Sequence, residues 1–146
     1  MSNARPPLTD RGEIAAVLHA AGILVTPQRI EIAKVLLEKK QHLSAEDVLG
    51  RLQSGQTAVS KATVYNTLKL FAVRGLLREV MVDATRLFYD SNTERHHHFY
   101  NIDDGELIDV GPEELSIVNL PGPPAGTATD AVDVVIRIRN VENSSG

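Results

Sequence analysis

The chain of 146 residues contains no cysteine. This absence excludes disulfide bonds, cysteine-ligated zinc, iron–sulfur clusters and thiolate chemistry. No run of apolar residues reaches the length of about 18 that a membrane helix needs, and residues 1–13 contain no hydrophobic signal region. We therefore expect a cytoplasmic protein that does not contact a membrane.

The net charge of −4 is unevenly distributed along the chain. Residues 1–88 carry 12 Lys and Arg against 8 Asp and Glu, whereas residues 89–146 carry 3 against 11. A basic half can bind a polyanion, and an acidic half can bind cations or repel DNA. Two differently solvated surfaces would produce the same imbalance.

Three consecutive histidines, His96, His97 and His98, are the most informative motif. Asp90 lies six residues before them and Asp109 eleven residues after them. Imidazole and carboxylate ligands suit Fe(II), Mn(II) or Zn(II). In a strand, His96 and His98 would share one face and His97 would lie on the other. A solvated edge strand or an expression tag could also contain three histidines, but the internal position and the nearby carboxylates favour a metal site.

Several helix signals occupy the first half of the chain. Asp10 is a candidate cap for a helix ending before Gly22, and Thr26-Pro27 starts a second helix. Ser44, with Asp47 three residues later, resembles a capping box for a third helix reaching about residue 52. Ser60 caps a fourth helix that stops at Gly75.

Strand-like segments follow these helices. Residues 76–82 and 85–90 read as a hairpin around Asp83-Ala84, so the first half is predicted to be a winged helix-turn-helix. Residues 96–102 and 106–110 read as two strands joined by a turn, and residues 131–140 as a last strand. Residues 111–120 read as a short helix.

The fourth helix is the candidate DNA-reading helix. Lysines neutralise phosphates, Asn can pair with adenine in the major groove, and Tyr or Thr can touch a thymine methyl. The polar residues concerned are Lys61, Thr63, Tyr65, Asn66 and Lys69. Any amphipathic helix has a polar face, but the cap spacing, the hairpin and the basic half favour DNA.

At these residues the chain resembles the ferric uptake regulator (Fur) superfamily. The matching motifs are VTPQR (25–29), HLSAEDV (42–48), KATVYNTL (61–68), RGLL (74–77), RLFYD (86–90), HHHFY (96–100) and GELIDV (105–110). Within the superfamily the chain is most similar to the iron response regulator (Irr) branch. The resemblance implies an α+β protein and a homodimeric repressor that binds double-stranded DNA. Its winged helix-turn-helix domain would occupy residues 1–90, and a small α/β dimerisation and sensing domain residues 91–146.

The resemblance also implies a regulatory metal site for Fe(II), Mn(II) or Zn(II). Carried over by position, its ligands are His42, Asp90, His96, His98 and Asp109. This set is closer to the peroxide-sensing (PerR) pattern, because a Fur site would have Glu where Tyr89 stands. His97 is assigned to a second site or to haem, which is associated with histidine clusters in the Irr branch.

The leading hypothesis is therefore a metal- or haem-responsive repressor of iron and haem homeostasis genes. A peroxide- or manganese-sensing repressor of the same fold is the alternative. A non-haem iron enzyme built on two histidines and a carboxylate is a third class, but it would leave the winged helix without a role.

Overall fold

The computed structural model describes residues 7–94 and 96–142. The chain divides into two compact units, Met1–Glu94 (the N-terminal unit) and Arg95–Gly146 (the C-terminal unit). Among the described residues, no helix is long and apolar enough to cross a membrane.

The N-terminal unit contains four helices, α1 (Arg11–Ala20), α2 (Pro27–Leu37), α3 (Ala45–Ser54) and α4 (Lys61–Val73). Each begins where the sequence predicted, because a side-chain oxygen accepts a hydrogen bond from the backbone N–H three residues later. The capping residues are Asp10, Thr26, Ser44 and Ser60. The capping box is also confirmed, since the Asp47 carboxylate accepts a hydrogen bond from Ser44 N at 3.1 Å.

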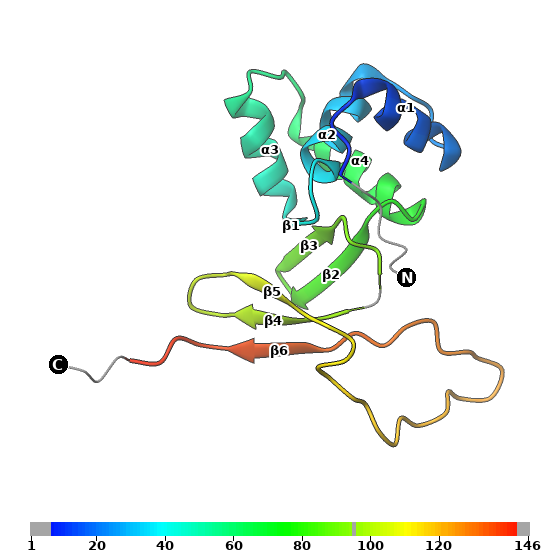
Figure 1. Ribbon diagram of the computed structural model, residues 1–146, viewed down its shortest axis with the longest axis vertical. Helices are drawn as coiled ribbons and strands as arrows, with labels where there is room; N and C mark the ends of the chain where they lie inside the picture. Colours follow the sequence, from blue (N-terminus) through cyan, green and yellow to red (C-terminus); the bar gives the residue numbers. More distant parts are fainter. Residues whose placement is uncertain (1–6, 95, 143–146) are drawn as a thin grey trace. The chain divides into compact units, whose positions relative to one another are not determined.

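A three-stranded antiparallel sheet completes the N-terminal unit, with strand order β1-β3-β2 (Figure 1). Its strands are β1 (His42–Leu43), β2 (Arg78–Asp83) and β3 (Arg86–Asp90). The predicted hairpin is confirmed, and Asp83 shapes its turn by accepting hydrogen bonds from the backbone and hydroxyl of Thr85. Strand β1 was not predicted, because two residues carry too little pattern to identify a strand.

The hydrophobic core lies between the helices of this unit. Its largest fully buried side chains include Phe71, Ile14, Leu18, Ile32 and Leu36, which come from α1, α2 and α4. Gly75 has φ +81°, a left-handed conformation that suits glycine, and follows the end of α4 where a stop was predicted. Helices followed by a strand hairpin confirm the winged helix-turn-helix.

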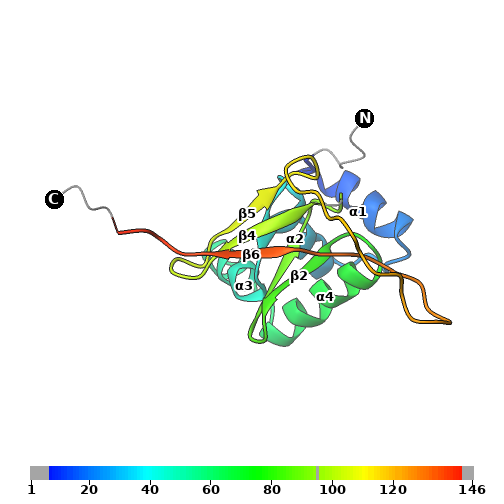
Figure 2. The same cartoon turned by 90° about the horizontal axis from the view of Figure 1, so that it is seen from below.

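The C-terminal unit contains a second three-stranded sheet, of order β5-β4-β6. Its strands are β4 (His97–Asn101), β5 (Leu107–Val110) and β6 (Val135–Ile138). The central strand β4 is antiparallel to β5 and parallel to β6, and Figures 1 and 2 both show it between them. Gly105, at φ +75°, lies in the turn between β4 and β5.

The helix predicted over residues 111–120 is wrong. Its beginning forms a single turn, in which Glu114 N donates to Gly111 O at 3.0 Å and the Glu114 carboxylate accepts from Gly111 N at 2.7 Å. One turn does not offset the cost of helix nucleation, and Asn119 has φ +58°, which a helix cannot accommodate. The α+β class is confirmed, with every helix of the described residues in the N-terminal unit.

Candidate metal centre and recognition helix

Two histidines and one aspartate converge in the C-terminal unit. The pairing of β4 with β5 places His98 directly opposite Asp109. His96 precedes β4, and its ring centroid lies 4.5 Å from that of His98. The side chains of His96 and His98 are only 5% and 4% exposed, while that of Asp109 is 50% exposed. The site therefore has a buried imidazole side and a carboxylate that reaches solvent.

The distances within this cluster fit a bound metal ion. Asp109 Oδ1 lies 3.3 Å from His96 Nε2 and 3.4 Å from His98 Nε2. Two ligands about 2.0–2.1 Å from one ion, at a tetrahedral angle, lie about 3.3–3.4 Å apart. N–H···O hydrogen bonds are usually shorter, about 2.7–3.2 Å. The donor set of two imidazoles and a carboxylate is one that Fe(II), Mn(II) and Zn(II) accept.

The middle histidine is directed elsewhere. His97 Nδ1 accepts a hydrogen bond from the backbone N–H of Val134 at 3.1 Å, next to the start of β6. The predicted alternation along the histidine run is therefore observed, with His96 and His98 at Asp109 and His97 at β6. The role of His97 in a second site or in haem binding stays a prediction.

The other two predicted ligands lie together in the N-terminal unit. His42 and Asp90 are direct partners in the pairing of β1 with β3. Asp90 is 1% exposed, and its Oδ1 accepts a hydrogen bond from Asn92 N at 2.9 Å. The His42 ring contacts the edge of Phe88, with centroids 6.3 Å apart. Strand β1, which the sequence pattern did not predict, thus places His42 beside the buried carboxylate of Asp90.

Ser91 forms hydrogen bonds with the residues just before β1 and so stabilises this short strand. Its hydroxyl oxygen lies 3.0 Å from Gln41 N, which donates to it, and 3.1 Å from the carbonyl oxygens of Lys39 and Gln41. Ser91 N also donates to Gln41 O at 2.9 Å. These bonds lie immediately beside both His42 and Asp90 in the sequence. Ser91 was not identified from the sequence, because its partners are about 50 residues away.

Tyr89 occupies the position where the Fur pattern would have a glutamate. It is 5% exposed and belongs to the hydrophobic core. Burial raises the pKa of its hydroxyl, and the carboxylates of Glu79 and Glu46 raise it further. The position therefore contributes a neutral ring to packing.

The polar residues of α4 fall on distinct sides of the helix. Lys61, Tyr65 and Lys69 recur every four residues and so form one stripe. Both lysines and Asn66 are exposed, whereas Tyr65 is half-buried. The stripe combines two cations with an aromatic ring, and the exposed amide of Asn66 lies beside it.

Thr63 lies on another side of α4. Its hydroxyl is 2.8 Å from the Ser60 hydroxyl, and its backbone N–H donates to the same Ser60 oxygen at 3.1 Å. The Thr63 hydroxyl therefore belongs to the helix cap. Of the five predicted DNA-binding residues, Thr63 is the one whose contacts describe a local structural role.

Tyr65 has a partner that the sequence did not reveal. Its hydroxyl donates a hydrogen bond to Glu46 Oε1 at the start of α3. This bond raises the pKa of Tyr65 and lowers that of Glu46. The ammonium group of Lys61 lies 5.7 Å from the centre of the Tyr65 ring, within cation–π range. Glu46 and Tyr65 meet only because α3 and α4 pack together in the folded protein.

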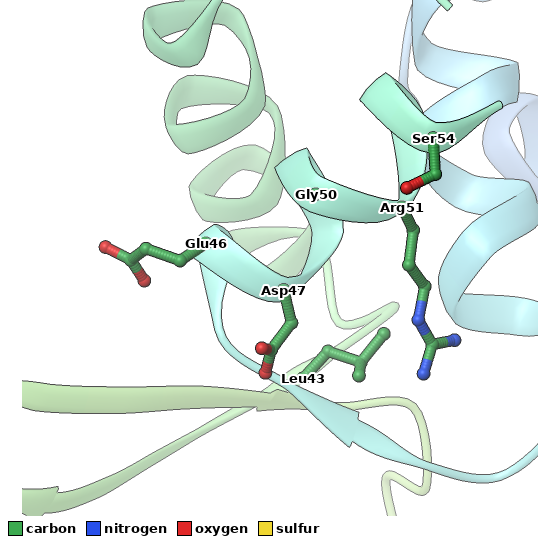
Figure 3. A pocket seen from close by; sticks show the side chains of 6 residues that line it. All are labelled: Leu43, Glu46, Asp47, Gly50, Arg51 and Ser54. Carbon is green, nitrogen blue, oxygen red and sulfur yellow. The ribbon is translucent and has the colours of Figure 1, made fainter. Parts of the chain in front are cut away.

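A shallow hollow lies along α3, and Figure 3 shows its lining residues. They are Leu43, Glu46, Asp47, Gly50, Arg51 and Ser54. Asp47 serves the cap with Ser44, and Arg51 donates to Gln41 Oε1 at 3.1 Å and pairs with Glu38 at 3.6 Å. In this view the Glu46 side chain extends to the left and the Arg51 side chain extends downward. The charged lining groups Glu46, Asp47 and Arg51 are thus engaged in structural contacts.

Comparison with known proteins gives a consistent result. Residues 20–119 match the sequence model of the Ferric uptake regulator family. A "Ferric uptake regulation protein" of Synechococcus elongatus is 41% identical over 106 residues, which cover 70% of this chain and 72% of that protein. A "Peroxide-responsive repressor PerR" of Staphylococcus aureus is 32% identical over 104 residues, covering 71% and 70%.

The fold is similar to that of solved regulators. The ferric uptake regulator of Pseudomonas aeruginosa, whose structure was determined with manganese, superimposes with a TM-score of 0.65 at 26% identity. The superposition covers 87% of this chain and 97% of that protein.

Proposed function

Since the chain belongs to the ferric uptake regulator family, we propose that it is a metal-responsive DNA-binding repressor of iron homeostasis genes. Family membership makes it a transcription regulator and not an enzyme. The single observation that carries the metal-responsive part is the convergence of His96, His98 and Asp109 at distances that fit a metal ion.

We propose that His42 and Asp90 complete the ligand set. Both lie in the sheet of strands β1, β3 and β2, where Asp90 is almost fully buried. Asp90 precedes His96 by six residues, so the extended chain limits their separation to roughly 20 Å. Ligands from both units would make domain arrangement depend on the metal, because the ion stabilises the arrangement in which all its ligands meet.

The DNA-binding surface in this proposal is α4. Lys61 and Lys69 would neutralise phosphates, and Asn66 and Tyr65 would face base edges in the major groove. Thr63 would stabilise the start of the helix through its bond to Ser60. The net positive charge of residues 1–88 supports binding to a polyanion.

We also propose that the protein acts as a homodimer through its C-terminal unit. Among the described residues of that unit, the buried hydrophobic side chains are Tyr100, Leu107 and Val110. Its exposed large hydrophobic side chains are Ile102, Ile108, Ile117, Val118, Leu120 and Val141. A small unit with this imbalance gains a sufficient core by sharing it with a second copy. Two copies would then present two recognition helices to successive major grooves.

Iron is the proposed signal, with the Synechococcus relative as its support. A peroxide or manganese signal is the second candidate, supported by the PerR relative and by the manganese-containing structural relative. Haem, the signal associated with the Irr branch, is the remaining alternative and is tested in the same assay.

The proposal is tested by measuring DNA binding with and without each ligand. A pool of random duplexes first yields the preferred operator for the Mn(II)-loaded protein. Affinity for this operator is then compared for the metal-free protein and for protein with Fe(II), Mn(II), Zn(II) or haem, while calorimetry reports metal binding. His96→Ala, His98→Ala and Asp109→Asn are expected to lose high-affinity metal binding and with it the response of DNA affinity.

His42→Ala and Asp90→Asn are expected to weaken metal binding less, but to uncouple DNA affinity from metal. His19→Ala is the matched control, because His19 is an exposed histidine on α1 and should change neither measurement. Equal operator affinity with and without every ligand would overturn the proposed regulation. Failure to enrich any duplex would overturn the DNA-binding function itself.

A further inference from the structure

We propose that Glu46 is a positioning residue that holds the ring of Tyr65 for contact with a thymine methyl group in the operator. The inference deepens the proposed function and rests on α4 being the DNA-reading helix. It adds a residue of α3 to the determinants of sequence preference.

Three contacts define the position of Tyr65. Its hydroxyl donates to Glu46 Oε1, its side chain packs against the hydrophobic core, and Lys61 Nζ lies 5.7 Å from the ring centre. The ring is therefore restrained by its hydroxyl, by core packing and by a cation over its face. A restrained side chain loses less conformational entropy on binding than a free one.

Glu46 lies in the first turn of α3, where its carboxylate also interacts with its own backbone N–H, but the bond from Tyr65 is the larger influence on its pKa. The start of α3 is already closed by the reciprocal bonds between Ser44 and Asp47. Glu46 is exposed, and it places a negative charge beside the stripe formed by Lys61, Tyr65 and Lys69. Such a charge disfavours phosphate binding at every sequence. If Glu46 increases sequence preference by positioning Tyr65, this gain would offset the general loss of DNA affinity that its charge causes.

The bond also determines what Tyr65 can offer to DNA. Its hydroxyl hydrogen is donated to Glu46, so the hydroxyl has no hydrogen left to donate to a base, and the ring edge offers an apolar contact. Apolar contact with the C5 methyl group distinguishes thymine from the other bases in the major groove. The bond therefore favours contact of the ring with thymine over a base edge that would accept a hydrogen bond from the tyrosine hydroxyl.

The test compares base preferences of full-length variants, loaded with Mn(II), on a random duplex pool. Glu46→Gln keeps an acceptor of the same length but removes the charge, whereas Glu46→Ala removes both. We expect Glu46→Gln to keep the thymine preference and to bind all duplexes more tightly. Glu46→Ala and Tyr65→Phe should each lose preference at the same one position by about fourfold, the factor that corresponds to burying one methyl-sized group. Combining the two changes should cause no further loss.

Glu38→Ala is the matched control, because it removes another exposed carboxylate of the N-terminal unit and should leave preference unchanged. Thermal melting verifies that each variant is folded. Loss of preference in Tyr65→Phe but not in Glu46→Ala would overturn the proposal. It would mean that the Tyr65 hydroxyl contacts DNA directly. Unchanged preference in both would overturn it while leaving the proposed function intact. A wild-type protein that enriches no duplex would instead refute the proposed function.

Discussion

The Nδ1 atom of His97 accepts a hydrogen bond from Val134 N at 3.1 Å, so the middle histidine of the run joins β4 to the chain entering β6. His96 and His98, its neighbours on either side, both approach Asp109. The alternation of side chains along an extended chain thus separates a sheet contact from a metal centre.

His97→Ala is expected to leave Mn(II) affinity within about threefold of the wild type, and to lower stability by about 1 kcal/mol through loss of one hydrogen bond. His97→Asn offers an acceptor near the same place and should recover part of that stability. Calorimetric metal titration and urea denaturation provide the two measurements. Losses of metal affinity as large as those in His96→Ala and His98→Ala would contradict the division of roles.

Lys61→Ala and Lys69→Ala should each weaken binding to all duplexes alike. Each removes one phosphate contact, so the slope of log affinity against log salt should become shallower by about 0.9. Lys34→Ala is the control, since Lys34 is exposed on α2. Slopes unchanged by both substitutions would mean that α4 does not lie against the DNA backbone.

Asn66→Ala should relax base preference at one operator position by roughly 1–3 kcal/mol, the discrimination that a bidentate amide–adenine pair provides. Asn66→Arg should shift that position toward guanine, because the guanidinium pairs with guanine O6 and N7. Selection from a random duplex pool measures both effects. An operator profile identical to that of the wild type in both variants would show that Asn66 reads no base.

The bond between Tyr65 and Glu46 should have a pH signature. The bond lowers the pKa of Glu46 below its ordinary 4.5, so its contribution to stability is present above 4.5 and disappears as pH falls through the lowered value. It raises the pKa of Tyr65 above 10.0, so the contribution is present below 10.0 and disappears as pH rises through the raised value. The stability difference between wild type and Glu46→Ala should therefore be largest between these two pH values.

Urea denaturation across pH measures that difference, and phenolate absorbance reports the tyrosine. Glu46→Ala should move one tyrosine titration toward pH 10, and Tyr65→Phe should remove that transition altogether. Titration curves that coincide in wild type and Glu46→Ala would show that the two groups are not bonded in solution.

Ser91→Ala should destabilise the N-terminal unit by about 1–3 kcal/mol, because Gln41 N loses its buried acceptor. If His42 and Asp90 are metal ligands, the variant should also bind Mn(II) more weakly, since the β1–β3 pairing positions both. Ser54→Ala, at an exposed position near the end of α3, should change neither quantity. If Ser91→Ala leaves the stability of the N-terminal unit unchanged, Ser91 does not stabilise β1.

Local chemistry in the sequence determined the start of every helix, the wing hairpin and the β4–β5 turn. Asp10, Thr26, Ser44 and Ser60 act through the backbone three residues away, so a short window contains both partners. The opposite faces of His96 and His97 follow from the geometry of an extended chain and needed no tertiary information.

Features that depend on residues far apart in the sequence were decided by the tertiary structure alone. Strand β1 exists because β3 pairs with it, Glu46 meets Tyr65 because α3 packs beside α4, and His97 finds Val134 only through the parallel pairing of β4 with β6. Residues 111–120 show the converse, because their local pattern favoured a helix that the backbone of Asn119 does not permit. Hydrogen bonds between residues 19 to 52 positions apart leave no periodic trace in a sequence, since either partner by itself is an ordinary polar residue.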